Sequence, residues 1–381
     1  MERTPKAILE EVYGIVESNP DVSHLPENYE KLAQWLQQVI HSERTQAFTR
    51  ALLACLLAKV DKGDDIDIRH PYTEIPEKSY SGRHYDEEYI GEFCVAKGLK
   101  ANLTTAFLTP ALRTKNTPLT RGVSLSSKDS AAEQAFLEIL SAVEEYNGDK
   151  AEFAKSVLKE AIRLLYQKTL THQKTLEDLL QKSTSQSALS IHRIMNILKK
   201  HLKSERSSRL PVLMIAACYA VAEKSLGKHV RKIARHTAAD VRTGTLGDVE
   251  IECVGADGTN VIVYEIKMRP LSVGDLKNAL EKVRHARDPI SQYVFIVNSP
   301  PKSGLTELLN QPNLPVEFLV FDCLSFVEHF LHIFHESRME FLEKYKELLL
   351  NEPDSSVSYA LKKAFLVLWA EEASSESGLS H

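Results

Sequence analysis

Two carboxylates and a lysine within residues 245–269 have a spacing that could hold a divalent cation beside an ammonium group. Asp248 stands at the head of one expected strand, and Glu265 and Lys267 lie on the next. Because side chains alternate along a strand, Glu265 and Lys267 project from the same face, while Tyr264 and Ile266 point to the other face and into the core. The pattern predicts oxygen ligands and a positive charge at one point of a sheet.

A tight connection is expected between these two strands. Residues 255–260, Gly-Ala-Asp-Gly-Thr-Asn, supply residue types that adopt the positive φ of a hairpin turn. The hairpin would bring Asp248 back toward Glu265. Glu250 and Glu252 share a face with Asp248, and either could join the site. Asp248 is favoured because it follows Gly247 at the strand entrance, where a ligand can point into a cleft.

The order Asp248, sixteen residues, Glu265-x-Lys267 resembles the signature of the PD-(D/E)xK nucleases. Gly247 occupies the position of the proline in that signature. The structural alternative for Glu265 and Lys267 is a solvated charge pair on a sheet, worth only tenths of a kcal/mol.

The elements expected around the signature follow the order of that nuclease core. They are a helix over 210–226, the hairpin, a helix over 273–287, a strand over 292–298, a short helix over 303–310 and a strand over 316–322. The last two strands are almost continuously apolar, as expected for strands covered on both faces. We therefore expect an α/β fold: a restriction-endonuclease-like core, with a mixed central sheet flanked by helices, and a large, mainly helical N-terminal region.

Three segments nearer the N-terminus resemble motifs of the SacI family of type II restriction endonucleases. They are Tyr80-Ser-x-Arg-x-x-Asp86, the Phe-Leu-Thr segment that ends at Arg113, and the segment that ends at Arg121-Gly. Arginine suits bidentate contacts with guanine edges and phosphates. The alternative for Arg83 is a structural pair with Asp86, and Ser81 or Asp86 could cap a helix that begins near Tyr85. The candidate DNA-binding residues are Ser81, Arg83, Arg113, Arg121, Arg242 and Arg269.

The resemblance implies Mg²⁺ held by Asp248, Glu265 and the carbonyl of Ile266, with Lys267 stabilising hydroxide and negative charge. Glu223 would reach a metal-bound water, or would simply lie on the helix surface. The implied activity is that of a homodimeric type II restriction endonuclease, which hydrolyses both strands of duplex DNA and leaves 5′-phosphate and 3′-hydroxyl ends. Its functional partner would be a cognate DNA methyltransferase. The alternatives are a repair or junction nuclease of the same superfamily and a non-catalytic DNA-binding protein.

Composition restricts the other possibilities. The five cysteines are scattered and form no Cys-x-x-Cys pair, which indicates a reducing cytoplasm rather than a disulfide framework or a thiolate zinc site. No stretch has the length of a membrane span, and the N-terminus lacks the apolar core of a signal peptide.

The net charge is −5, but residues 199–242 hold eleven Lys or Arg against three acids, a local surplus of eight. Nucleic-acid affinity depends on such clusters.

The remaining sequence is predicted to be mostly helical, with helices over 4–18, 28–42, 44–60, 131–146, 150–168, 172–203, 323–350 and 357–370. A break is expected over 183–187. Five regions follow: a helical region 1–65, a loop-rich segment for DNA recognition 66–130, a helical region 131–205, the nuclease core 206–350, and a C-terminal helix and tail 351–381. The aromatic stripe from Phe326 to Tyr345 is typical of a core, with a dimer seam as the alternative.

Overall fold

The structure is a computed structural model that describes residues 4–374, except 44–45, 76, 102–103, 114–115, 126–127, 184–188, 235–245, 256–257, 300, 302, 310 and 355. The chain divides into two compact units, Met1–Lys174 and Thr175–His381. The helical region expected over 131–205 is therefore shared between the two units. In the described part of the chain, no helix has both the length and the apolar character needed to cross a bilayer.

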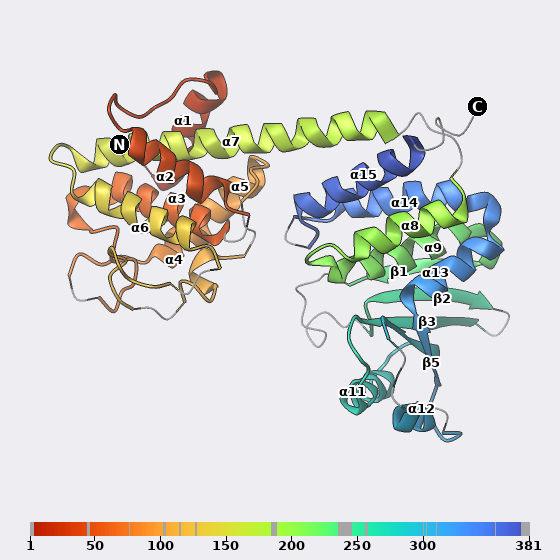
Figure 1. Ribbon diagram of the computed structural model, residues 1–381. Helices are drawn as coiled ribbons and strands as arrows, with labels where there is room; N and C mark the ends of the chain where they lie inside the picture. The colour runs from red at the N-terminus through yellow and green to blue at the C-terminus, as the bar shows by residue number, and fades with distance from the viewer. Residues whose placement is uncertain are drawn as a thin grey trace. The chain divides into compact units, whose positions relative to one another are not determined.

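The unit Met1–Lys174 is helical (Figure 1). Its longer helices are α1 (Pro5–Ser18), α2 (Glu30–His41), α3 (Gln46–Lys62), α6 (Ser130–Glu144) and most of α7 (Lys150–Ser183). The short elements between α3 and α6 are η1 (Gly63–Asp65), α4 (Gly82–Tyr85), η2 (Asp86–Gly91), α5 (Glu92–Ala96) and η3 (Ala106–Leu108). Every residue of α3 from Ala47 to Lys59 is buried, so this helix forms the centre of the unit.

The unit Thr175–His381 is built on a five-stranded mixed sheet, which confirms the α/β class. Its strands are β1 (Lys228–Ile233), β2 (Val249–Gly255), β3 (Gly258–Lys267), β4 (Ile290–Val297) and β5 (Glu317–Asp322), and they lie in that order. The pairs β1–β2 and β2–β3 are antiparallel, whereas β3–β4 and β4–β5 are parallel. The hairpin expected between the two signature strands is therefore confirmed as β2–β3.

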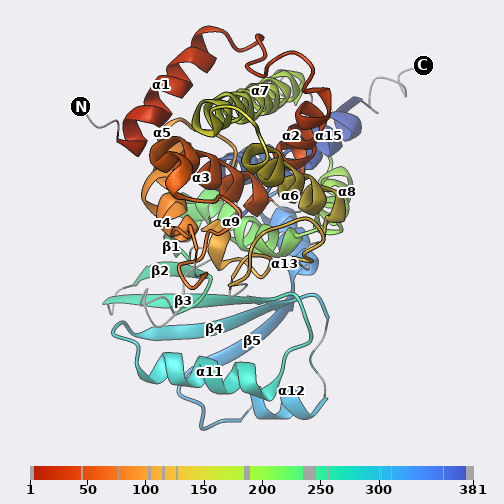
Figure 2. The same cartoon turned by 90° about the vertical axis from the view of Figure 1, so that its left-hand side faces the viewer.

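Helices cover both faces of this sheet (Figure 2). On one face, α9 (Leu210–Leu226) and α13 (Cys323–Ile333) pack on alternate strand residues such as Val249 and Tyr264. The outer helices of this layer are α8 (Ile191–Leu202), α14 (Arg338–Asn351), α15 (Tyr359–Ser374) and the short η4 (Ser207–Arg209). On the other face, α11 (Val273–Arg284) and α12 (Ser303–Leu309) cover a second cluster that contains Val263 and Phe295.

Three predicted elements differ from the structure. The helix expected over 323–350 is broken by η5 (His335–Ser337) into α13 and α14. This break lets α13 pack on β5 and α8 while α14 packs on α15, and both contact α9. The break expected between 168 and 172 does not exist, because α7 continues to Ser183. The helix expected over 172–203 is divided close to the break expected over 183–187: α7 ends at Ser183, residues 184–188 lie outside the described residues, and α8, which Ser190 caps, begins at Ile191.

The stripe from Phe326 to Tyr345 is core, as predicted. Phe330, Phe341 and Tyr345 are buried in the cluster that lies against the sheet, and Phe326 and Phe334 pack on its rim.

Candidate functional site

The alternation of β3 places Glu265 and Lys267 as predicted. Tyr264 is buried on the face covered by α9, while Glu265 lies on the face covered by α11. Glu265 is only 8% exposed. Lys267 lies two residues further along the strand, and its Nζ is 2.7 Å from Glu265 Oε1. The pair is thus partly buried, unlike the solvated surface pair considered as the structural alternative.

Asp248 stands beside Glu265 at the entrance to β2. The register pairs Val249 with Tyr264, so the next position places Asp248 opposite Glu265. The Asp248 N–H donates to the Tyr264 carbonyl at 2.8 Å, and the Ile266 N–H donates to Asp248 Oδ2 at 2.8 Å. Backbone hydrogen bonds therefore fix both the strand position and the side chain of this carboxylate.

Gly247 allows the chain to approach β3 closely at this point. A Cβ on Gly247 would lie 2.6 Å from the Tyr264 carbonyl oxygen and 2.5 Å from a methyl group of Val263. Both separations are too short for non-bonded atoms, so only glycine fits without moving β3. Gly247, which stands where the resembled signature has a proline, thus has a steric role in placing Asp248.

The two carboxylates interact electrostatically. Burial raises the pKa of Asp248, and the negative charge of Glu265 raises it further. The Ile266 N–H and the ammonium groups of Lys267 and Lys282 act in the opposite direction. The negative charge of Glu265 thus disfavours the ionisation of Asp248, and a bound cation would relieve this repulsion.

Lys282 and Tyr293 are part of this group, although the sequence did not single them out. Lys282 Nζ on α11 lies 3.1 Å from Glu265 Oε2. The Tyr293 hydroxyl on β4 lies 3.1 Å from the same oxygen and 3.1 Å from the Leu246 carbonyl, so it donates its proton to one of them at a time. The register of β3 and β4 pairs Val263 with Tyr293, so Tyr293 lies on the same face of the sheet as Val263 and Glu265. Without this register, the contact between Tyr293 and Glu265 could not have been inferred.

The alternative acids on β2 have other contacts. Glu250 is buried, and its Oε1 accepts the Leu246 N–H at 2.9 Å, so it closes the turn that precedes β2. Glu252 lies 3.5 Å from His229 Nε2 on β1. Glu223 is exposed on α9, whose buried side packs on the opposite face of the sheet. Its proposed contact with a metal-bound water stays a prediction.

The donors at Asp248 and Glu265 suit a hard cation. Within the described residues, no three His, Cys, Asp or Glu side chains are grouped so that they could hold a metal ion. Any cation at this site would therefore depend on two carboxylates, backbone oxygen and water, which is a set that Mg²⁺ accepts. The N–H and C=O of a strand residue point to the same side, so the Ile266 carbonyl projects toward the strand edge that carries Asp248.

The candidate DNA-binding residues of the N-terminal unit are already engaged within the protein. Of the two caps considered, Ser81 is the one that caps α4, by accepting the His84 N–H, and the helix begins at Gly82 and not near Tyr85. Arg83 pairs with Glu87 at 2.9 Å, not with Asp86. Asp86 is instead buried against Arg50, with Nε to Oδ1 at 2.6 Å. The Arg83–Asp86 clip is therefore wrong, because the carboxylate of Asp86 points into the core.

The other candidate arginines differ in the contacts that the structure gives for them. Arg113 is exposed. Arg121 pairs with Glu138 at 2.9 Å and with Glu145 at 2.6 Å, so a phosphate would have to displace two carboxylates. Arg269 pairs with Asp275 through both terminal nitrogens, at 2.6 and 2.8 Å. Arg242 lies outside the described residues.

Part of the positive surplus over 199–242 is structural. Arg209 is buried, and its Nη2 lies 2.6 Å from Glu352 Oε1. Arg231 pairs with Asp288 at 2.5 Å. Because Arg209 and Arg231 are already paired with carboxylates, fewer basic side chains of residues 199–242 could contact a nucleic acid than the local charge surplus implies.

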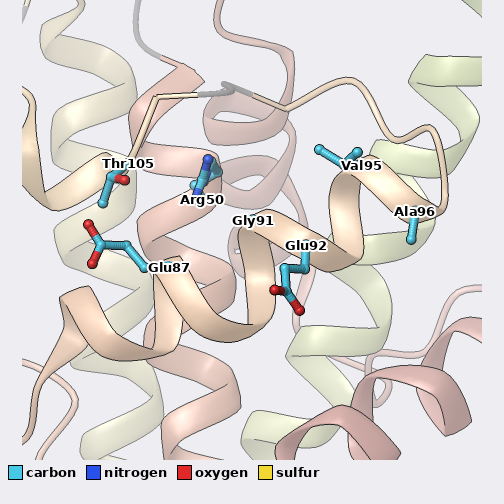
Figure 3. Close-up of a pocket in the computed structure, with 7 residues that line it drawn as sticks. All are labelled: Arg50, Glu87, Gly91, Glu92, Val95, Ala96 and Thr105. Atoms are coloured by element: carbon cyan, nitrogen blue, oxygen red, sulfur yellow. The ribbon is translucent and has the colours of Figure 1, made fainter. Parts of the chain in front are cut away.

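A broad hollow of about 630 Å³ lies in the N-terminal unit and not at the carboxylates (Figure 3). Its lining residues are Arg50, Glu87, Gly91, Glu92, Val95, Ala96 and Thr105. The Arg50 guanidinium is held by the side chain and the backbone carbonyl of Asp86. The hollow thus combines two acids with a cation committed to a structural pair, which is a poor arrangement for catalysis.

Comparison with known proteins adds no relative. A scan against models of protein families finds no match for this chain, and a search among curated proteins finds none either. The resemblance to PD-(D/E)xK nucleases therefore rests on the residues and on their arrangement.

Proposed function

We propose that the protein is a Mg²⁺-dependent endonuclease with a PD-(D/E)xK core, and that it acts on duplex DNA as a type II restriction enzyme. The observation that supports this most is the meeting of Asp248, Glu265 and Lys267 on one face of a mixed sheet. Apart from the additional strand β1, the order of elements from α9 to β5 agrees with the order expected from the resemblance, which supports the proposal. Sequence-specific cleavage of both strands as a homodimer, and a cognate methyltransferase as functional partner, belong to the same proposal.

The residues of the site would divide the chemistry among them. Asp248, Glu265 and the Ile266 carbonyl would hold Mg²⁺, which supplies charge neutralisation at the scissile phosphate and an acidified water. Lys267 orients Glu265 through its 2.7 Å contact and adds a fixed positive charge where negative charge develops. Hydrogen bonds with the backbone of β3 fix the position of Asp248, so its carboxylate would need little rearrangement before the reaction.

The test is digestion of a DNA of known sequence in Mg²⁺ or in EDTA, followed by mapping of the ends. We expect discrete products with 5′-phosphate ends in Mg²⁺ only. Glu265→Gln and Lys267→Met should reduce cleavage to the level seen in EDTA. The control is Glu281→Gln, which removes one exposed carboxylate from α11 and should leave cleavage unchanged.

Other outcomes would point elsewhere. Nicking confined to branched or damaged DNA would replace the restriction enzyme with a repair or junction nuclease of the same mechanism. Full cleavage by Glu265→Gln would exclude the proposed site. DNA binding without cleavage of any substrate in Mg²⁺ or Mn²⁺ would indicate a non-catalytic DNA-binding protein.

A further inference from the structure

Both oxygens of the Glu265 carboxylate have partners before any cation is present. Oε1 lies 2.7 Å from Lys267 Nζ, and Oε2 lies 3.1 Å from both Lys282 Nζ and the Tyr293 hydroxyl. The donors come from three elements, β3, α11 and β4. Glu265 is therefore the centre of a polar group within an apolar layer.

Lys282 occupies a position on α11 where an apolar residue would be expected. Leu276 and Ala279 of this helix are buried against the sheet, and Val283 packs on the same cluster. Residues three and four apart lie on one side of a helix, so Lys282 lies on the same side as Ala279. Its side chain is 19% exposed. A lysine rarely enters such a layer without a partner, and Glu265 is a partner of Lys282 here.

The charges of this group balance in the absence of a metal ion. Formally, two carboxylates, Asp248 and Glu265, are matched by two ammonium groups, because Lys267 and Lys282 both contact Glu265. A divalent cation brings the same charge as the two ammonium groups. An ammonium group and a divalent cation compete for the oxygen atoms of a carboxylate, because both bind through the same lone pairs.

We propose that Lys282 is a counter-ion of Glu265 that leaves Oε2 when the site binds a divalent cation. In this role Lys282 is a positioning residue, because it holds the carboxylate in place while the site is empty. Once released, it provides a second positive charge beside Lys267 for a DNA phosphate. This last step rests on the proposed nuclease function, whereas the counter-ion role concerns divalent-cation binding alone.

A purely structural role for Lys282 predicts the opposite effect on metal affinity. If Lys282 only anchored α11 to β3, its loss would loosen Glu265 and weaken cation binding. If Lys282 competes with the cation, its loss should strengthen binding, since one competitor and one repelling charge disappear. The sign of the change in affinity therefore separates the two roles.

The experiment is a titration of the full-length protein with Mn²⁺, in which electron paramagnetic resonance measures the free ion. Lys282→Met, and Lys282→Gln as a second neutral variant, should bind Mn²⁺ about fivefold more tightly than wild type, as expected when a nearby positive charge is removed from a partly buried site. Lys282→Arg keeps the charge and should stay within about twofold. Lys277→Met is the matched control, because Lys277 is an exposed lysine of the same helix.

Thermal unfolding of the same variants adds a second readout. Metal-free Lys282→Met should unfold at a lower temperature than wild type, because the buried Glu265 loses a partly buried counter-ion. Mn²⁺ should raise this temperature more than it does for wild type. Unchanged or weaker Mn²⁺ binding by both neutral variants, relative to Lys277→Met, would overturn the proposal.

The nuclease proposal can fail separately. A wild-type protein that binds Mn²⁺ through Glu265 but cleaves no DNA would contradict the nuclease function, while the Mn²⁺ affinities would still decide the role of Lys282. An identical Mn²⁺ isotherm for wild type and Glu265→Gln would overturn both.

Discussion

In the metal-free protein, the surroundings of Asp248 disfavour its ionised form. Burial and the neighbouring Glu265 both raise the pKa of Asp248 in the folded state. The folded protein thus binds a proton at Asp248 more readily than the unfolded chain does. Stability falls as the pH rises from the ordinary pKa of an aspartate through the raised pKa of the folded state. Above that window the ionised side chain destabilises the fold until a cation binds.

Asp248→Asn should therefore stabilise the metal-free protein at neutral pH. The amide oxygen can still accept the Ile266 N–H, while the unfavourable charge is removed. In EDTA, the melting temperature of Asp248→Asn should exceed that of wild type at pH 7, and the difference should shrink as the pH falls and Asp248 becomes protonated. Mg²⁺ should raise the melting temperature of wild type but not that of the variant. A variant less stable than wild type in EDTA at pH 7 would disprove the electrostatic argument.

At the scale of elements, the segment that resembles the SacI motif Tyr-Ser-x-Arg-x-x-Asp is tied into the core of its unit. Tyr80 is buried and donates to the Ile68 carbonyl at 3.1 Å. Asp86 begins the π-helical segment η2, pairs with Arg50 of α3, and accepts the Ala106 N–H. Arg50 is 4% exposed and Asp86 is fully buried. With Ser81 as the cap of α4, three residues of the motif therefore have structural contacts, and Arg83 is exposed and pairs with Glu87 at the surface.

Asp86→Ala should destabilise the N-terminal unit by about 3–5 kcal/mol, because it leaves a buried arginine without its counter-ion. Glu87→Ala is the control, since the Glu87–Arg83 pair lies at the surface and is worth at most about 1 kcal/mol. Chemical denaturation followed by the fluorescence of Trp35, in a Trp369→Phe background, would report on this unit alone. Equal effects of the two substitutions would show that the buried pair contributes no more than a surface pair.

Most elements around the site could be predicted because their sequences have a clear periodicity. The helix over 210–226 and the hairpin between β2 and β3 were found, and α11, β4, α12 and β5 differ from prediction by a few residues at their ends. β1 was missed because Lys-His-Val-Arg-Lys-Ile is a short, charged edge strand without the apolar pattern of the others. The break between α13 and α14 was missed because the apolar stripe continues across it.

The site was predictable as far as strand alternation and a hairpin allow. These two features place Asp248, Glu265 and Lys267 together without knowledge of the rest of the sheet. Lys282 and Tyr293 could not be found in this way, because their contacts depend on how α11 packs on the sheet and on the parallel register of β3 and β4. The partners of Asp86 and Arg121 were also hidden, since they are distant in the sequence.

For the whole molecule, the net charge of −5 means that DNA affinity would have to come from local surfaces. The candidate arginines are divided between the two units, with Arg83, Arg113 and Arg121 in one and Arg242 and Arg269 in the other. The carboxylates that would hold the cation belong to the unit Thr175–His381. The proposed enzyme therefore requires both units: one to carry the reaction and the other to supply most of the DNA contacts predicted from the sequence.

The central claim is that Asp248 and Glu265 bind one divalent cation, and anomalous diffraction from crystals of the full-length protein soaked in Mn²⁺ tests it most directly. We predict an anomalous peak between the two carboxylates, about 2.0–2.3 Å from an oxygen of each, with the Ile266 carbonyl as a further ligand. Glu265→Gln should lose the peak under the same conditions. A Mn²⁺ peak elsewhere, with Glu265 still bound to Lys267 and Lys282, would contradict the account.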